Sequence, residues 1–181
     1  MTSIGNSAFY GCSALQSIDI PSNVTTIGEE AFSNCSAMQS IIIPNSVTSI
    51  GNSAFYGCSA LQSIGIPSNV TTIGNNVFEG CHALKSINVS DDNKHYTSID
   101  GVLFNKELTT IIKLPQGKRL ETYSIPCSVR TIENNAFCWS EALKKIDMSD
   151  SMTSIGNSAF YRCYALQSID IPSNVTTIGE E

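Results

Sequence analysis

The sequence predicts an α/β repeat solenoid, in which short strands of successive units form a parallel sheet and short helical turns return the chain. The first observation is a motif that recurs with a period of 23 residues along the 181-residue chain. Each unit is too short to bury its own apolar face, so the units must stack on one another. The second is composition: only 14% of the residues are charged. Low charge suits a wall of stacked strands, because facing rows of like charge repel.

Each unit opens with a short strand. The pattern Leu-x-x-Ile-x-Ile-Pro, first present at residues 15–21, puts alternate isoleucines on one face of the strand. The proline ends the ladder because it has no N–H to donate. Neighbouring strands are expected about 4.8 Å apart, so equivalent side chains form ladders. The residues between the two isoleucines should point outward: Asp19, Ile42, Gly65, Asn88, Ser124, Asp147 and Asp170.

The second half of each unit carries the motifs Ile-Gly and Ala-Phe-x-x-Cys. Ile27-Gly28 predicts a turn, and residues 29–35 predict one or two helical turns, which are too short to be stable alone. We expect the five cysteines that follow Phe by three positions to be buried free thiols, because their parallel side chains hold the sulfurs apart. Cys127 and Cys138 lie outside this ladder and are the candidates for reactive thiols.

One segment breaks the period, because Leu84 and Leu120 are 36 residues apart. Asp100-Gly101 between apolar runs is a strong hairpin signal. We therefore predict a small antiparallel β-meander at residues 96–114, with strands at 96–99, 102–105 and 109–114. Two interpretations stay open: a structural variant of the repeat, or a projection that shapes a partner site.

These motifs resemble the BspA-like leucine-rich repeats, also called the Treponema pallidum type, along most of the chain. The resemblance implies a right-handed leucine-rich repeat solenoid whose parallel sheet lines the concave face, with short helical or 3-10 turns on the other side. It also implies a cell-surface or secreted protein, since some members act as adhesins toward host matrix proteins. Inserts similar to Ile-Asp-Gly-Val-Leu-Phe, here at residues 99–104, occur in the family.

We expect residues 1–181 to form a single leucine-rich repeat domain, cut from a longer array, with the meander inside one continuous, elongated core. Residues 1–30 recur at 152–181 with only two changes, Gly11 to Arg162 and Ser13 to Tyr164. This near-identity indicates recent duplication. Bare solenoid ends expose unpaired strands and apolar side chains, so end-to-end self-association is also expected.

Charge and motifs argue against several function classes. The net charge is −6, and no Lys or Arg precedes Lys85, so nucleic-acid binding is not expected. No apolar run is long enough for membrane insertion, and no signal peptide pattern is present. His82 and His95 are isolated, and Asp91-Asp92 is interpreted as a solvated turn. We therefore expect no metal, no cofactor and no catalytic site.

The sequence favours a non-catalytic module for protein–protein interaction or adhesion, with a host matrix or cell-surface protein as a candidate partner. A passive stalk or spacer and a carbohydrate-binding solenoid are the alternatives. Recognition faces are the common use of solenoids, and exposed aromatic and Arg side chains commonly anchor interfaces. The candidate partner-binding residues, mostly departures from the repeat, are Asp19, Ile42, Tyr96, Trp139, Lys144, Lys145, Arg162 and Tyr164.

Overall fold

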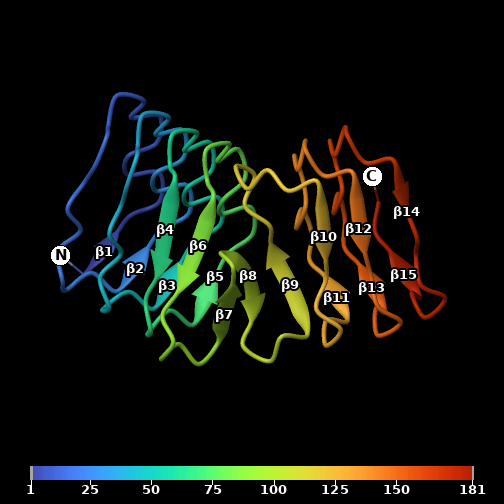
Figure 1. Ribbon diagram of the computed structural model, residues 1–181. Helices are drawn as coiled ribbons and strands as arrows, with labels where there is room; N and C mark the ends of the chain where they lie inside the picture. Colours follow the sequence, from blue (N-terminus) through green and yellow to red (C-terminus); the bar gives the residue numbers. More distant parts are fainter. Residues whose placement is uncertain (1, 181) are drawn as a thin grey trace.

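The computed structural model describes residues 2–180 and shows a β-solenoid of stacked coils (Figure 1). Each regular coil contributes two short strands, so two rows of strands run along the stack. The Ile-x-Ile row comprises β4 (Ser63–Ile66), β6 (Ser86–Val89), β10 (Thr122–Ser124), β12 (Lys145–Asp147) and β14 (Ser168–Ile169). The Thr-Ile row comprises β1 (Ser3–Ile4), β2 (Thr26–Ile27), β3 (Ser49–Ile50), β5 (Thr72–Ile73), β11 (Thr131–Ile132), β13 (Ser154–Ile155) and β15 (Thr177–Ile178).

Both rows are parallel and in register with the repeat. In the Ile-x-Ile row, Ile64 pairs with Ile87 and Tyr123 pairs with Ile146. The first two coils join this row through a single parallel bridge between Asp19 and Ile42. The predicted stacking of equivalent positions is confirmed.

The Thr-Ile row corrects one expectation. The turn predicted at Ile27-Gly28 is wrong, because Thr26–Ile27 is a strand, and Ile27 pairs with Ile50 of the next coil. Gly28 lies where the coils approach most closely. A Cβ built on the equivalent Gly51 would lie 2.5 Å from the backbone N of Glu29. A glycine is therefore needed here, because any larger residue would prevent the close approach of the two coils.

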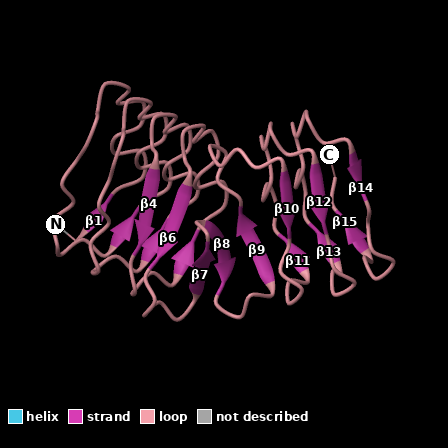
Figure 2. Cartoon of the chain, viewed as in Figure 1, coloured by secondary structure: helices cyan, strands magenta, loops and turns pink. Residues whose placement is uncertain are grey.

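The predicted helical or 3-10 turns are wrong: Figure 2 shows no helix in the described part of the chain. The segment from the repeat glycine to the ladder cysteine, here called the arc, is instead a series of tight turns. In the arc of residues 28–35, Glu30 and Asn34 have φ of 53° and 60°, values that interrupt an α-helix. Their N–H groups and that of Phe32 donate to the next coil. The arc is therefore held by its neighbour and has no helix of its own. In the described residues, no helix could span a membrane.

The β-meander is present at the predicted place. Its strands are β7 (Tyr96–Ile99), β8 (Val102–Asn105) and β9 (Thr110–Lys113), and β8 is antiparallel to both neighbours. Asp100 and Gly101 both have positive φ, 50° and 76°, as a type I′ hairpin turn requires. Strand β9 then rejoins the Thr-Ile row by pairing in parallel with β11.

The meander divides the core into two clusters, in contrast to the one continuous core that the repeat predicts. Leu103 of β8 packs in the N-terminal cluster, whereas Val102 and Phe104 pack in the C-terminal one. The phenylalanine ladder shows the same division. Phe9, Phe32, Phe55 and Phe78 stack with ring centroids 5.2 to 6.3 Å apart, and the ladder resumes only with Phe137 and Phe160.

The ladder cysteines are free, as predicted, and four of the five are buried; the expectation of burial is wrong for Cys12, which is exposed in the first coil. The thiol of Cys58 donates to the carbonyl of Phe32 at 3.2 Å, and Cys81 donates to Phe55 at 3.1 Å. The cysteine thus fills an apolar site and satisfies a carbonyl of an earlier coil. The prediction that Cys138 is a reactive thiol is wrong. It is buried, and burial together with the Glu79 carboxylate raises its pKa to about 12.

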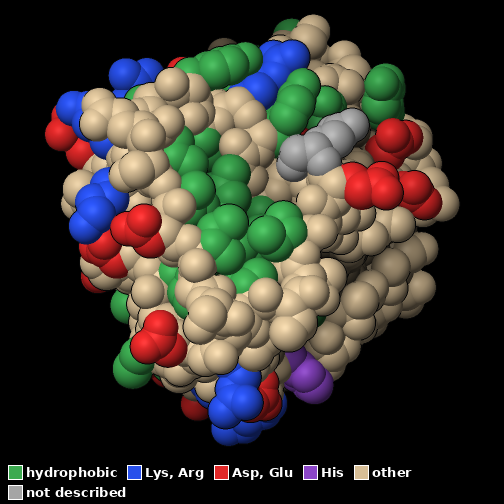
Figure 3. Space-filling model, turned by 90° about the vertical axis from the view of Figure 1, so that its right-hand side faces the viewer, with side chains coloured by type: hydrophobic (Ala, Val, Ile, Leu, Met, Phe, Trp, Pro, Cys, Tyr) green, Lys and Arg blue, Asp and Glu red, His purple; other side chains and the backbone are tan. Residues whose placement is uncertain are grey.

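Apolar side chains are also exposed at the C-terminal end of the stack. Figure 3 views this end and shows hydrophobic side chains gathered at the centre of the face. Ile171 and Ile178 are exposed to 46% and 59%. The expected end-to-end association stays a prediction.

The close approach at the repeat glycine gives a first test. Gly51→Ala places a Cβ against the backbone of the previous coil, so we expect it to lower the unfolding free energy by about 2 kcal/mol or more. Gly5 holds the same repeat position, but a Cβ added there would have no heavy atom within 4 Å, which makes Gly5→Ala the matched control. Urea unfolding measures both variants, and equal losses would contradict the explanation.

Thiol accessibility gives a second test. Cys12 and Cys127 are exposed, whereas the other five cysteines are buried. Burial raises the pKa of the Cys35, Cys58, Cys81 and Cys163 thiols, so they should stay protonated at pH 9, where a free cysteine is substantially ionised. Iodoacetamide labelling followed by mass spectrometry should modify only Cys12 and Cys127 until denaturant is added. Native labelling of Cys138 would contradict its placement.

Candidate functional site

The most unusual region of the molecule is the seam, defined as the gap between the arcs of residues 74–81 and 133–140. Regular arcs donate to the next arc: Ser53, Phe55 and Gly57 each donate an N–H to a carbonyl of the following coil. The meander supplies no equivalent arc. The corresponding N–H groups of residues 76, 78 and 80 therefore have no hydrogen-bond acceptor within residues 2–180.

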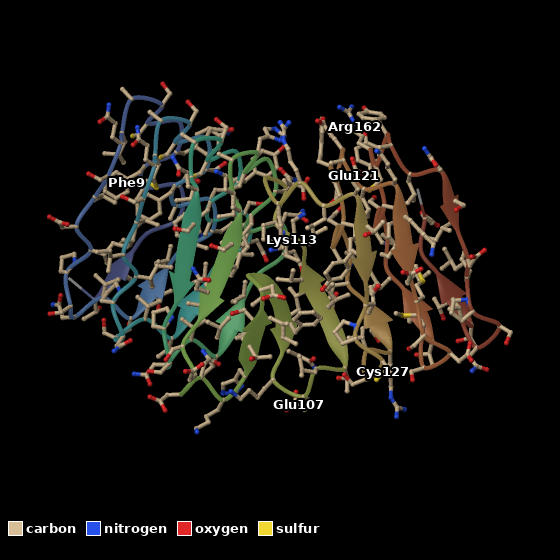
Figure 4. All side chains as sticks on the ribbon, in the orientation of Figure 1. Phe9, Glu107, Lys113, Glu121, Cys127 and Arg162 are labelled. Atoms are coloured by element: carbon tan, nitrogen blue, oxygen red, sulfur yellow. The ribbon has the colours of Figure 1, made fainter. Side chains whose placement is uncertain are left out.

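A buried polar cluster crosses the middle of the seam. Lys113 of β9 donates to the Glu79 carboxylate at 3.0 Å and to the Asn135 carbonyl at 2.8 Å. Its side chain is 8% exposed, and that of Glu79 is 13% exposed. Gln116 donates to the other Glu79 oxygen at 3.0 Å and to the Cys138 carbonyl at 3.4 Å. Side chains from the end of the meander and from the segment just after it thus reach the carbonyls of the second arc. Figure 4 shows Lys113 near the middle of the stack.

Aromatic and cationic side chains close one end of the seam and continue along the next coil. The Trp139 ring meets the His82 ring edge-on across the gap, with centroids 5.5 Å apart. The Arg162 guanidinium lies 4.2 Å from the Trp139 centroid and 5.1 Å from that of Tyr161. We call Trp139, Tyr161, Arg162 and Tyr164 the aromatic ridge. Tyr161 and Tyr164 are 41% and 70% exposed, and Figure 4 shows Arg162 at the upper edge of the molecule.

The remaining candidate residues lie on the exposed Ile-x-Ile row or on the meander. Asp19 and Ile42 are neighbours, and Ile42 is 81% exposed beside a shallow depression of about 400 Å³. Tyr96 is half-buried, and its hydroxyl accepts the Ile73 N–H at 3.1 Å. Tyr96 therefore also supports the meander, and the candidates do not form one cluster.

Lys144 and Lys145 are exposed and make separate ion pairs. Lys144 lies 2.8 Å from Glu121, and Lys145 lies 2.7 Å from Asp147. The hydrogen bond from Lys145, with a second one from Ser124, lowers the pKa of Asp147. Exposed pairs of this kind contribute little to stability. They give the C-terminal part of this face a mixed-charge surface that the Ser-rich N-terminal part lacks.

Comparison with known proteins agrees with this architecture. The family described as the BspA type leucine-rich repeat region matches in six copies, over residues 1–111 and 114–181. The chain belongs to this family. No curated protein matches the chain. The sequence-based resemblance is confirmed.

Solved structures of several bacterial proteins are similar over nearly the whole chain. A protein from Eubacterium ventriosum is 34% identical, with a TM-score of 0.86, over 98% of this chain and 53% of that one. The pneumococcal vaccine antigen PcpA is 27% identical, with a TM-score of 0.82, over 97% and 49%. A cell surface protein from Faecalibacterium prausnitzii is 31% identical, with a TM-score of 0.74, over 99% and 60%. The chain thus spans about half to three fifths of these proteins.

Three seam residues that depart from the BspA-type repeat were not among the predicted site residues. Glu79 and Cys138 follow the Phe, where Tyr10, Tyr56 and Tyr161 stand in other coils. Glu133 replaces the repeat glycine, and it is accepted because the preceding coil has no arc to clash with. These departures were visible in the repeat alignment. The sequence did not show that the two arcs face each other across the seam, because the arcs are far apart in the chain. Asn76 and Asn135, whose side chains hydrogen-bond at 2.9 Å across it, are 59 residues apart. Among the residues described, no group of three or more metal-ligating acidic, His or Cys side chains occurs.

The buried pair generates a stability prediction. Glu79→Gln leaves the Lys113 ammonium buried without its counter-charge, so we expect a loss of about 3 kcal/mol of unfolding free energy. Glu121→Gln is the control, because its pair with Lys144 is exposed and should contribute less than about 1 kcal/mol. Chemical denaturation of both variants measures the difference. A loss at Glu79 as small as the control's would mean that water enters the cluster.

Proposed function

We propose that this chain is a non-catalytic protein-interaction module of a cell-surface or secreted protein, which binds a protein partner through its solenoid surface. Family membership supports a repeat scaffold, and one similar structure is described as a cell surface protein. Adhesion to a host matrix or cell-surface protein is the specific form proposed. Because the chain spans only part of its relatives, this proposal concerns the segment's own surface.

The aromatic ridge is the observation that carries the proposal. Trp, Tyr and Arg are the residue types that dominate the binding energy of protein interfaces. On this ridge they are adjacent, and Tyr164 is 70% exposed. The Trp139–Arg162 stacking fixes two of these side chains before any partner binds, which reduces the entropy lost on association.

Backbone conformation gives the ridge further support. Trp139 and Arg162 have φ of 63° and 58°, at a repeat position where Gly11, Gly57 and Gly80 stand in other coils. A left-handed conformation costs a non-glycine residue about 1 kcal/mol. Large side chains thus occupy two positions where glycine would be less strained. Strained backbone conformations of this kind are common at functional sites.

A passive spacer is the alternative, and the near-identity of residues 1–30 and 152–181 favours it. However, the two positions that differ, Arg162 and Tyr164, both belong to the ridge. The duplicated unit has kept its scaffold and changed only this surface. That pattern favours a binding role over a spacer.

The duplicate also supplies the test. Arg162→Gly with Tyr164→Ser gives residues 152–181 the sequence of residues 1–30, which already folds in this stack. We expect unchanged unfolding free energy within about 1 kcal/mol, because lost cation–π energy and relieved strain offset each other. Affinity for the partner should fall at least about tenfold, measured by surface plasmon resonance against collagen, laminin, fibronectin and a cell-surface protein extract.

The matched control is Tyr56→Ala. Tyr56 is 41% exposed, as is Tyr161 at the same repeat position, but it lies away from the ridge. The control should retain affinity. No binding by the unaltered chain, or equal affinity of the double variant, would favour the spacer.

A further inference from the structure

A pocket occupies the open part of the seam. It measures about 510 Å³, within the range of small-molecule sites. One wall is the arc of residues 74–79, the other is residues 133–135, and the floor is the meander. The pocket exists because the meander replaces one arc. It does not overlap the aromatic ridge.

The pocket presents polar groups that the fold leaves unused. The Glu133 carboxylate and the Asn75 side-chain amide lie at the exposed mouth of the pocket and have no partner within residues 2–180. The backbone N–H groups of Asn76 and Phe78 also lack acceptors there. Glu133 is notable because packing requires glycine at this position in the regular coils. The site thus offers both donors and acceptors.

The same pocket has an apolar floor. The partly buried side chains of Ile73, Tyr96 and Ile112 line it beside the polar groups, and the fully buried Leu103 lies beneath them. A ligand that matches both parts carries hydroxyl groups that donate and accept hydrogen bonds and has a C–H face that packs on the floor. An anionic ligand is disfavoured, since Lys113 is already paired with Glu79 and Glu133 adds a negative charge.

The ends of the pocket limit the size of the ligand. The Asn135 side-chain amide donates to Asn76 at 2.9 Å across the gap, and the Lys113–Glu79 pair bridges it farther along. A peptide added as an extra arc would have to break both links. The short space between these two links therefore favours a small molecule over a polypeptide.

The geometry points to a binding site for a neutral saccharide unit, one or two sugar rings, in the seam. The Glu133 carboxylate accepts hydrogen bonds from vicinal hydroxyls, and the N–H groups of Asn76 and Phe78 donate to hydroxyl oxygens. The Ile112 and Tyr96 side chains pack against the apolar face of the ring. The site is independent of the protein-binding ridge, so either proposal can fail alone.

Saturation-transfer NMR on the 181-residue chain tests this site, with the methyl glycosides of glucose, galactose, mannose and N-acetylglucosamine and the disaccharides maltose and lactose as probes. At least one should bind with a millimolar dissociation constant. Glu133→Gly restores the repeat glycine and removes the carboxylate, and it should weaken binding at least about fivefold. Glu29→Gln removes an exposed carboxylate from a regular arc and should leave binding unchanged.

Three results would overturn the inference: no transfer to any of the glycosides, equal binding by Glu133→Gly, or binding of methylammonium with none of the sugars. The last would identify a site for small cations. Thermal unfolding of Glu133→Gly controls for folding, because a variant that unfolds like the unaltered chain loses only the ligand contact. Should it unfold earlier, Glu133→Gln replaces it, with the same expected loss of affinity.

Discussion

The distance between successive coils is the constraint on which the rest of this structure depends. Strands, arcs and asparagine side chains all hydrogen-bond to the neighbouring coil, as in the bond from the Asn75 N–H to the Asn52 side-chain oxygen at 2.9 Å. These bonds hold only if the backbones approach closely along the whole coil. The repeat glycine, the stacked Phe rings and the thiol-to-carbonyl bonds of the cysteines all serve that spacing. Little of a regular coil is therefore free to vary.

Where the spacing is interrupted, the sequence becomes irregular. The meander extends the C-terminal part of the Thr-Ile row through β9, but none of its strands pairs with β5, and it supplies no arc. The hydrogen bonds that a regular arc would accept are therefore missing. Lys113 and Gln116 replace part of that bonding with side chains, and Trp139 covers one end through His82. The remaining space is the pocket. Ion pair, aromatic contact and cavity are thus consequences of a single missing arc.

The features that follow from periodicity could be predicted from the sequence alone. Stacked units, phenylalanine and cysteine ladders, and the meander with its Asp100-Gly101 turn all depend on spacing and local turn chemistry. The arcs were misjudged because seven-residue segments such as 29–35 carry helix-compatible residues, while the left-handed conformation of Glu30 and Asn34 is imposed by the next coil. The Thr-Ile row was missed because a two-residue strand has no alternation to recognise. Among the candidate residues, Trp139 and Arg162 do meet, whereas Asp19 and Lys145 lie on a separate face.

The duplicated unit separates the residues that maintain the fold from those that are free to serve recognition. Residues 1–30 and 152–181 share every ladder position, as expected of a recent duplication. Their two differences place an exposed Arg in the last arc and an exposed Tyr directly after it, and Arg162 occupies a left-handed site that glycine would fill with less strain. Glu133 is the complementary case, in which a packing requirement is lifted and a charged residue replaces the glycine. At neither place does coil stacking require the residue that is present: Glu133 is only tolerated there, and Arg162 is less favourable than glycine. These two departures are therefore the positions at which the proposed binding roles are placed.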